Sequence, residues 1–459
     1  MAVYLVCMIA ALAGLLFGFD TGIISGALLF IEQGFPVTTI IKELIVSSVL
    51  LGAMVGSLSS GRLTDFYGRR KVILIISVMF TVGTLIASLA PNVETILIGR
   101  ICIGVAIGIG SYTAPLYIAE VAPLKLRGGL VSLNQLAITI GIMCSYFINY
   151  IFHNTQGSWR LMFAIGIVPA IMLGIGMFFL PESPRWLVKQ NRLNDAKNTL
   201  RYLRKSDQVD EELSEIVKSF HKAKLSEVLA KWIRPVLILG ITLGFLQQVT
   251  GINTIIYYAP TIFQLAGFED TSSSILATIG IGVVNVLATI FAIYYLDKIG
   301  RRVLLLTGLI GMCLSLLSLS LAFQVDIHTY YLRWVAVFST FVYVISFAFS
   351  LGAMLWLLVS EIFPLNVRGA AMSIAVFSCW FWNFVISATF LSLLNAMGAS
   401  STFLLYAVMC ILGFIYCYYK VPETNGVSLE QIESNIRRGL PVREIGQPVL
   451  VPEASLKKA

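Results

Sequence analysis

Long apolar stretches alternate with short polar breaks along the 459 residues of this chain. The stretches are about 20 residues long or longer, which is the length a helix needs to cross the roughly 30 Å hydrocarbon core of a bilayer. A segment in lipid must satisfy its own backbone polar groups, so each stretch is predicted to be helical. The pattern predicts twelve spans, at residues 4–31, 42–61, 72–90, 94–119, 129–152, 160–180, 235–264, 274–296, 303–324, 332–359, 370–394 and 402–420. The expected fold class is an all-α polytopic membrane protein.

Composition supports this fold class, and the charge pattern predicts the orientation. Hydrophobic residues make up 58% of the chain and charged residues 12%, with a mean hydropathy of +0.87. The formal net charge is +8, but 28 of the 32 Lys and Arg residues fall in the C-terminal tail and in the breaks after even-numbered spans. This positive-inside pattern predicts cytoplasmic termini and argues against a nucleic-acid partner. Because no basic segment precedes the first apolar run, we expect that run to remain as its own insertion signal in the cell (inner) membrane.

The second part of the chain repeats the first. Three motifs recur: RLTDFYGRR (62–70) as YLDKIGRR (295–302), EVAPLKLRGG (120–129) as EIFPLNVRGA (361–370), and PESPR (181–185) as PETNG (422–426). Two six-helix halves related by a parallel repeat are the construction expected of a major facilitator type transporter. We therefore expect an N-terminal half at 1–183, a linker at 184–234, a C-terminal half at 235–421 and a cytoplasmic tail at 422–459.

The linker carries most of the charge outside the spans. Ser183 followed by Pro184 predicts a helix start, with the serine as N-cap and the proline in the first turn. Apolar residues then recur at helical spacing among charged ones, at Val209, Leu213, Ile216 and Phe220. The pattern favours three or four short amphipathic helices on the cytoplasmic face, and the alternative is a flexible linker.

Residues typical of metal sites and catalytic sites are scattered. The seven cysteines all fall within predicted spans and form no CxxC pair, so we interpret them as small apolar packing residues. The three histidines fall in predicted loops and make neither a metal site nor a relay. No phosphate-binding glycine loop occurs outside the spans. These observations predict no metal, no cofactor and no enzymatic activity.

Asp20 is a lone charge inside an apolar run, LLFGFDTGIISG. A carboxylate in mid-span costs about 2.5 to 3.5 kcal/mol on insertion scales, so it is normally paired or faces a wet cavity. The expected partner is Arg100, the other unambiguous charge well inside the first six spans. Burial favours the neutral acid whereas Arg100 favours the carboxylate, so the pair can load or release a proton; the alternative is a static ion pair. Asp20 points away from a stripe suited to close helix packing, at Gly14, Gly18, Gly22 and Gly26.

Several motifs in fixed order resemble the sugar porter family of the major facilitator superfamily. They are GRLTDFYGRR, PLYIAEVAPLKLRG, PESPRWL, QQVTGINTIIYYAP, DKIGRR and PETNG. The resemblance implies proton-coupled uptake of a pentose or hexose by alternating access, as in bacterial symporters, with Asp20 and Arg100 as the proton-coupling pair. A uniporter on the same fold is an alternative, because related facilitators also keep an acid here. A non-transporting sugar sensor is a further alternative from another class.

Amides in the spans are candidates for binding sugar hydroxyls, with aromatic faces for the C–H side of the ring. On an unbroken helix Gln247 and Asn253 would project about 120° apart, so Gly251 is the candidate break that brings both into one cavity. The amides could instead join helices by hydrogen bonds. The resemblance implies a substrate site of Phe17, Gln135, Gln247, Gln248, Asn253, Tyr257, Asn285, Trp356, Trp380 and Asn383.

Departures from the family pattern leave the identity of the sugar open. The run from Gly352 to Trp356 lacks the Gly-Pro that many relatives have, so the hinge there can differ. Cys379 stands where several relatives carry an amide. The two halves need no partner chain to form a site, so we expect a functional monomer in contact with membrane lipid.

Charged loop motifs are expected to form a cytoplasmic gate. Gly68 supplies a tight turn, after which Arg69 and Arg70 can reach nearby acids. The resemblance implies that such pairs hold the cytoplasmic side shut while the outer side is open. An exposed ion pair contributes only about 0 to 1 kcal/mol of stability, so a gate made of such pairs can open readily. The expected gate set is Asp65, Arg69, Arg70, Glu120, Arg127, Glu182, Arg185, Asp297, Arg301, Arg302, Glu361, Arg368 and Glu423.

Overall fold

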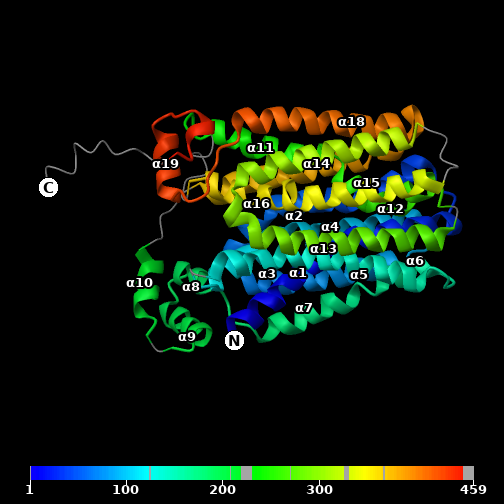
Figure 1. Ribbon diagram of the computed structural model, residues 1–459. Coiled ribbons are helices and arrows are strands. Elements are labelled where there is room, and N and C mark those ends of the chain that lie inside the picture. Colours follow the sequence, from blue (N-terminus) through cyan, green and yellow to red (C-terminus); the bar gives the residue numbers. More distant parts are fainter. Residues whose placement is uncertain are drawn as a thin grey trace.

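The computed structural model describes residues 2–123, 126–206, 208–218, 230–268, 270–324, 330–364 and 367–447. Within these residues the regular structure is helical, and twelve helical stretches are long and apolar enough to cross a membrane. The all-helical fold class with twelve spans is therefore confirmed. Figure 1 shows the spans as a bundle of roughly parallel helices, with the short linker helices and the C-terminal helix gathered at one end.

The first six spans comprise seven helices, because the sixth span is interrupted. They are α1 (Ala2–Gly34), α2 (Thr39–Tyr67), α3 (Arg69–Ser88), α4 (Val93–Val121), α5 (Arg127–Phe152), α6 (Ser158–Ala164) and α7 (Ile167–Phe179). The linker contributes α8 (Pro184–Lys189), α9 (Leu193–Arg204) and α10 (Asp210–Lys218).

The last six spans comprise eight helices, followed by two short ones. They are α11 (Arg234–Val249), α12 (Ile252–Leu265), α13 (Thr271–Ile299), α14 (Arg301–Ala322), α15 (Tyr330–Phe349), α16 (Leu351–Ile362), α17 (Arg368–Ser387) and α18 (Phe390–Lys420). The helix α19 (Leu429–Arg437) and the 3-10 helix η3 (Val442–Glu444) follow.

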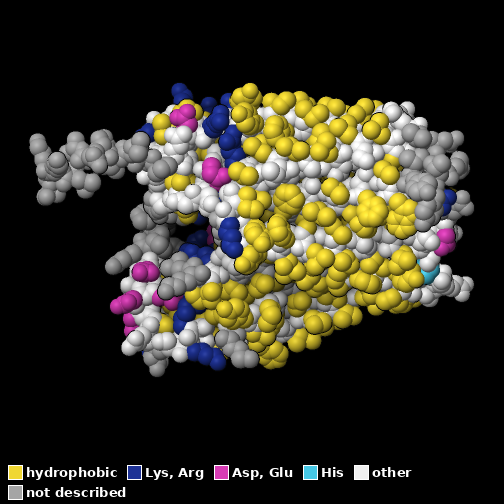
Figure 2. All heavy atoms as spheres, in the orientation of Figure 1, with side chains coloured by type: hydrophobic (Ala, Val, Ile, Leu, Met, Phe, Trp, Pro, Cys, Tyr) yellow, Lys and Arg dark blue, Asp and Glu magenta, His cyan; other side chains and the backbone are white. Residues whose placement is uncertain are grey.

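The two ends of the bundle differ in charge. We call the end that carries α8, α9, α10 and α19 the charged end and the other the opposite end. Figure 2 shows hydrophobic side chains covering the middle of the visible face, and most of the visible Lys, Arg, Asp and Glu side chains at the charged end. An apolar belt with a polar end is the surface expected of a protein whose middle lies in hydrocarbon.

Two spans of the C-terminal half are broken within the bundle. Gly251 separates α11 from α12 and adopts a φ of +93°, a conformation that glycine reaches without steric cost. This confirms the predicted break in span seven. Ser350 separates α15 from α16 with φ −112° and ψ −106°, two residues before Gly352. Span ten therefore has a break without the Gly-Pro pair that many relatives carry.

The chain folds back inside α18. Gly398 has a φ of +79° and ψ of 166°, which no continuous helix contains. The Phe390 ring lies 6.5 Å from the rings of both Phe403 and Tyr406, whereas thirteen residues of unbroken helix would span about 20 Å. Residues before Gly398 thus form a short helix that extends span eleven, and span twelve follows it. This agrees with the predicted limits of 370–394 and 402–420.

The predicted glycine stripe of α1 packs against α5. A Cβ atom on Gly18 would lie 1.8 Å from the Ile138 carbonyl oxygen, and one on Gly22 would lie 2.0 Å from Ser145 Oγ. Helices in lipid are not held together by the hydrophobic effect, because the lipid tails are as apolar as the side chains. The close approach of α1 and α5 stabilises their contact through van der Waals packing instead. The stripe fixes the rotation of α1 and therefore the direction in which Asp20 points.

Substituting Gly18 by alanine is expected to destabilise the α1–α5 contact by about 1 to 3 kcal/mol, because the methyl group has no room beside Ile138. The measurement is the midpoint of thermal unfolding in detergent. Gly61→Ala on α2 is the matched control, since a Cβ atom there meets nothing within 4 Å. Equal midpoints for the two variants would contradict the packing argument.

The linker folds on its own small core against the N-terminal half. Ser183 caps α8 by accepting from Trp186 N, as predicted. Trp186 Nε1 donates to Asp65 O at 3.0 Å, and Arg204 Nη1 donates to Val121 O at 2.9 Å. The core comprises Trp186, Leu187, Val188, Ala196, Leu200, Val209 and Ile216, with Leu213 against it. The amphipathic helices of the linker are therefore present, whereas Phe220 lies outside the described residues.

Candidate functional site

Asp20 and Arg100 meet in the middle of the N-terminal half. Arg100 Nη1 lies 3.4 Å from Asp20 Oδ1, and the two residues are 1% and 2% exposed. The predicted pairing is present, and its role in proton coupling stays a prediction. The contact is long for a charge-assisted hydrogen bond, which is typically about 2.7 to 2.9 Å. It is therefore a weak link between two buried charged groups.

Arg100 makes its shorter contact elsewhere. Its Nε donates to Ile45 O at 2.6 Å and its Nη2 to Val46 O at 3.4 Å, both on α2. Asp20 Oδ2 is buried and has no hydrogen-bond partner among the described residues. The Arg100 guanidinium therefore has hydrogen-bond acceptors on α2 that do not depend on Asp20. Asp20 Oδ2 is available to carry a proton. This arrangement suits a carboxyl group that changes its protonation state.

Amides gather around the break in span seven. Gln248 Nε2 donates to Gln247 Oε1 at 3.0 Å, and Asn253 Nδ2 donates to Gln248 Oε1 at 2.6 Å. Gln247 Nε2 donates to Leu351 O at 3.0 Å, just past the break in span ten. The break at Gly251 brings these side chains together, as the sequence predicts. Both glutamines are buried, so their polar groups are held where water is scarce.

Cys379 of α17 completes this cluster. Its Sγ lies 3.1 Å from Gln247 Oε1 and 3.0 Å from Gln248 Nε2. The interpretation of the cysteines as apolar packing residues is therefore wrong for Cys379, because its thiol contacts two amides. We call Gln247, Gln248, Asn253 and Cys379 the amide cluster. A thiol is a weak donor and a weak acceptor, so Cys379 makes weaker hydrogen bonds in this cluster than an amide at the same position would make.

Aromatic residues lie close by. The rings of Phe17 on α1 and Trp380 on α17 are 5.2 Å apart and join the two halves of the protein. Trp380 Nε1 is buried with no hydrogen-bond partner in the described chain. Asn383 Nδ2 donates to Tyr257 OH at 3.4 Å. A buried donor without an acceptor is costly, and a polar ligand removes that cost.

The remaining predicted substrate residues lie on helices that border the cluster. Gln135 is on α5, Asn285 on α13 and Trp356 on α16. Helix α5 packs on α13, and α16 packs on α11. Among the described residues, no side-chain hydrogen bond joins these three to the amide cluster. The structure also adds Tyr146 of α5, whose hydroxyl donates to Ile256 O of α12 at 3.0 Å and links the two halves.

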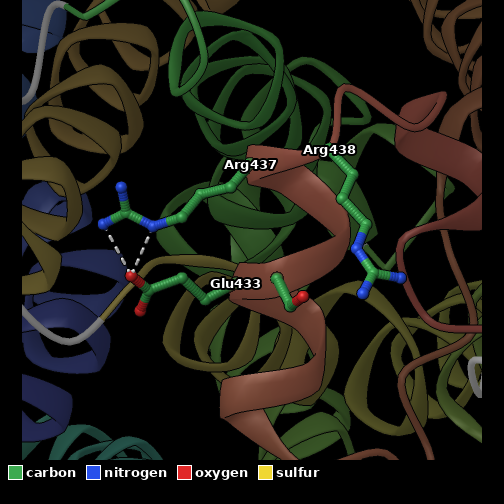
Figure 3. Close-up of a pocket in the computed structure, with 4 residues that line it drawn as sticks. Glu433, Arg437 and Arg438 are labelled. Carbon is green, nitrogen blue, oxygen red and sulfur yellow. Dashed lines mark hydrogen bonds and ion pairs between the residues drawn. The ribbon is translucent and has the colours of Figure 1, made fainter.

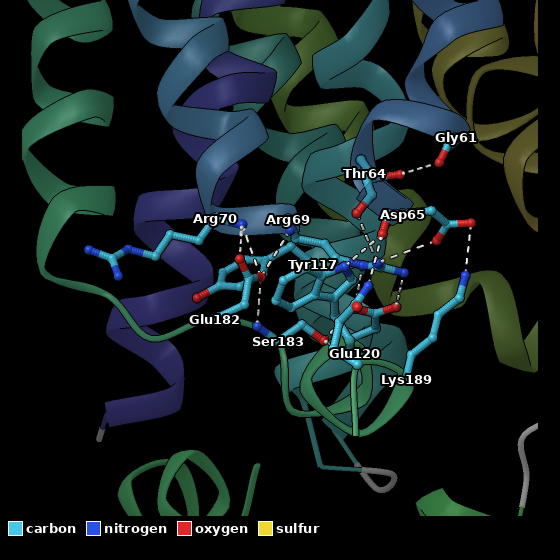
Figure 4. Close-up of polar contacts among 12 residues, drawn as sticks. Gly61, Thr64, Asp65, Arg69, Arg70, Tyr117, Glu120, Glu182, Ser183 and Lys189 are labelled. Atoms are coloured by element: carbon cyan, nitrogen blue, oxygen red, sulfur yellow. Dashed lines mark hydrogen bonds and ion pairs between the residues drawn. The ribbon is translucent and has the colours of Figure 1, made fainter. Parts of the chain in front are cut away.

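A charged network ties the N-terminal half together at the charged end (Figure 4). Arg69 Nη2 donates to Glu120 Oε1 at 2.9 Å, and Arg69 Nη1 lies 3.5 Å from Asp65 Oδ1. The carboxylate of Glu182 accepts from the backbone N–H groups of Arg69 and Arg70 at 2.9 and 3.1 Å. Gly68, with a φ of +91°, provides the turn that presents these N–H groups.

The C-terminal half builds the same network from its repeat. Arg301 Nη2 donates to Glu361 Oε1 at 3.1 Å. Glu423 accepts from the backbone N–H groups of Arg301 and Arg302, each at 3.0 Å, after the turn at Gly300. Glu182 and Glu423 therefore cap α3 and α14, where a carboxylate satisfies free N–H groups and the helix dipole.

One detail of the predicted gate is wrong. The Arg70 side chain was predicted to reach an acid, but it donates to the Met177 carbonyl group, and the Arg302 side chain likewise donates to the Tyr418 carbonyl group. The reason is that each acid is already engaged by the backbone of the same turn. Arg368 Nε likewise donates to Phe363 O.

In both networks the acid–arginine pairs that we describe join elements of one half. Arg127 and Arg185 lie beside the first network without a described hydrogen bond to its acids, and the side chain of Asp297 lies outside the described residues. A role of the whole set in gating stays a prediction.

Burial raises the pKa of Glu182 above its ordinary value. The backbone N–H groups of Ser183, Arg70 and Arg69 and the charge of Arg69 act in the opposite direction. Burial is the larger effect, and the hydrogen bonds and Arg69 offset part of it.

A shallow recess on α19 is a separate feature of the charged end. It is lined by Glu433, Ser434, Arg437 and Arg438 (Figure 3). Arg437 pairs with Glu433 at 2.8 Å and stacks over the Trp232 ring at 4.1 Å. These contacts hold the segment after span twelve against the end of the linker, and none of the predicted substrate residues lines the recess.

Comparison with known proteins gives consistent results over almost the whole chain. The model of the family described as "Sugar (and other) transporter" matches residues 6–436. The galactose-proton symporter of Escherichia coli K12 is 42% identical over 447 residues, which cover 96% of each protein. The D-xylose transporter of Levilactobacillus brevis is 40% identical over 434 residues, which cover 93% of this chain and 94% of that protein.

Solved structures agree. The inward-open conformation of the xylose transporter XylE from E. coli matches with a TM-score of 0.81 and 31% identity, covering 94% of this chain and 99% of that chain. The proton:xylose symporter XylE bound to 6-bromo-6-deoxy-D-glucose matches with a TM-score of 0.79 and 32% identity, covering 94% and 98%. These proteins are membrane sugar transporters, not enzymes.

Proposed function

Because the chain belongs to the sugar transporter family of the major facilitator superfamily, we propose that it carries a monosaccharide across the membrane together with a proton. The observation that carries the coupling is the buried Asp20–Arg100 pair with its single long contact and its unpartnered Oδ2. A protonated Asp20 is neutral and releases Arg100 to the carbonyl groups of α2. A deprotonated Asp20 attracts Arg100 again.

The sugar site of this proposal is the amide cluster together with Phe17, Trp380, Tyr257 and Asn383, and it extends to Gln135, Asn285 and Trp356. The amides hydrogen-bond one another in the structure, and in this proposal sugar hydroxyls replace those bonds when sugar binds. Trp380 offers both a free Nε1 donor and a ring face for the C–H side of the sugar.

The charged end faces the cytoplasm in this proposal, because Lys and Arg concentrate there. Both termini are then cytoplasmic, and the membrane is the inner membrane of a bacterial cell. One chain acts alone, since every residue of the proposed site comes from the same polypeptide. The charged networks serve the cytoplasmic gate by holding the end of each half rigid while the halves rock against each other.

Uptake into proteoliposomes tests the proposal. Radiolabelled xylose, glucose and galactose are offered separately, with and without an inward proton gradient. We expect one or more of them to accumulate above the external concentration only when the gradient is present. Equilibration without accumulation for every sugar would reject coupling and leave a uniporter, and no sugar-specific flux would favour a sensor.

A further inference from the structure

Glu43 is a buried acid that belongs neither to the proposed sugar site nor to the Asp20–Arg100 pair. It lies on the first turns of α2, at the opposite end, and is 3% exposed. Burying a carboxylate this deeply costs several kcal/mol unless strong hydrogen bonds compensate. Its partners must therefore explain its presence.

Those partners belong to the other half of the protein. Ser392 N donates to Glu43 Oε1 at 2.7 Å, and Ser392 Oγ donates to Glu43 Oε2 at 2.7 Å. Ser392 lies in the first turn of α18, whose N–H groups lack acceptors within the helix. Glu43 thus caps, from the N-terminal half, a helix of the C-terminal half. A second, exposed bond lies beside it, from Asn395 Nδ2 to Thr39 Oγ1 at 3.2 Å.

The same stretch of α2 holds Arg100. Ile45 and Val46, two and three residues beyond Glu43, present the carbonyl groups that accept from Arg100 Nε and Nη2. A continuous series of contacts therefore runs from Asp20 through Arg100 and α2 to Glu43 and on to Ser392. Glu43 and the two acceptors of Arg100 therefore lie within one turn of α2.

We propose that the Glu43–Ser392 contact is the latch that closes the opposite end of the transporter, and that Glu43 is the positioning residue that ties this closure to the Asp20–Arg100 pair. This latch rests on the proposed transport function, because it gives one gate of alternating access. Both bonds must break before the two halves separate at this end. The latch is charge-assisted, so it is stronger than a bond between neutral groups.

The test measures how far apart the halves lie at the opposite end. Spin labels are placed at Gln156 and Ser401, exposed positions on different halves. The background variant keeps the buried Cys379 of the amide cluster, and its other six native cysteines are replaced. Distances are recorded by pulsed electron resonance in liposomes without sugar or gradient. Glu43→Leu removes both acceptors, and we expect the ratio of long to short distances to rise about tenfold or more.

Two further variants make the test decisive. Ser392→Ala keeps the acid and loses one donor, and we expect a smaller rise of about threefold. Glu32→Leu is the matched control, because Glu32 pairs at 2.7 Å with Lys42 of its own half, and its distances should equal those of the wild type. A Glu43→Leu ratio equal to the wild type, or to that of Glu32→Leu, overturns the latch. If Glu43→Leu does not fold, an unchanged Ser392→Ala distribution overturns it.

The uptake assay separates this inference from the proposed function. The distances are measured without transport, so they report the latch whether or not the protein couples sugar to protons. A shift in Glu43→Leu in a protein that shows no gradient-driven uptake keeps the latch and rejects the coupling. Gradient-driven uptake with unchanged distances keeps the coupling and rejects the latch.

Discussion

Asp20→Asn is expected to abolish gradient-driven accumulation of sugar while leaving sugar exchange intact. With one proton per sugar, an inward gradient of two pH units supports accumulation of up to about 100-fold, since each unit is worth about 1.4 kcal/mol. Asparagine keeps the shape of the side chain and its contact with Arg100 but cannot take up or release a proton. The measurement is the ratio of internal to external labelled sugar in proteoliposomes at steady state.

The control for this variant is Asp270→Asn. Asp270 is an exposed acid that caps α13 by accepting from Ser273 N, and asparagine is an equally good cap, so accumulation should match the wild type. Accumulation by Asp20→Asn at the wild-type level would contradict its role as proton carrier. Loss of both accumulation and exchange would instead indicate that the pair has a structural role in the N-terminal half.

Gln248→Ala is expected to raise the sugar concentration that gives half-maximal exchange by about 100-fold. The side chain donates to Gln247 and accepts from Asn253, so it occupies the centre of the amide cluster. In the proposed site sugar hydroxyls replace these two bonds, and the loss of two hydrogen bonds to the sugar, of about 1.5 kcal/mol each, accounts for this factor. The measurement is the rate of labelled sugar exchange as a function of sugar concentration, without a proton gradient.

Gln264→Ala is the matched control for this second variant. Gln264 is on α12 near the opposite end and has no described contact with the amide cluster. Its half-maximal concentration should stay within about threefold of the wild type, the scatter expected of a substitution away from the site. An equally small change in Gln248→Ala would mean that the amides join helices and do not hold the sugar.

Some of this architecture follows directly from the order of residues. Hydropathy predicts twelve spans because an apolar segment of about 20 residues can cross lipid as a helix that satisfies its own backbone polar groups. Repeated motifs predict two halves, and the equivalent capping of α3 by Glu182 and of α14 by Glu423 bears this out. The scarcity of charge in the first six spans is enough to pair Asp20 with Arg100.

Hydrogen-bond partners between distant segments depended on tertiary structure. Glu43 and Ser392 are 349 positions apart, and no local pattern marks either residue. Two other contacts also depend on the tertiary structure. Cys379 contacts two glutamines, and the Arg70 side chain donates to a carbonyl group.

The physical reason is that hydrophobic burial is non-directional, so the composition and periodicity of the sequence are enough to predict it. Hydrogen bonds require particular atoms within about 3 Å at particular angles. Those positions depend on the rotation of each helix, on close contacts such as that of Gly18 with Ile138, and on breaks such as Gly251 and Gly398. The sequence by itself therefore determined which segments cross the membrane and how they repeat. Only the packed helices decided which side chains meet.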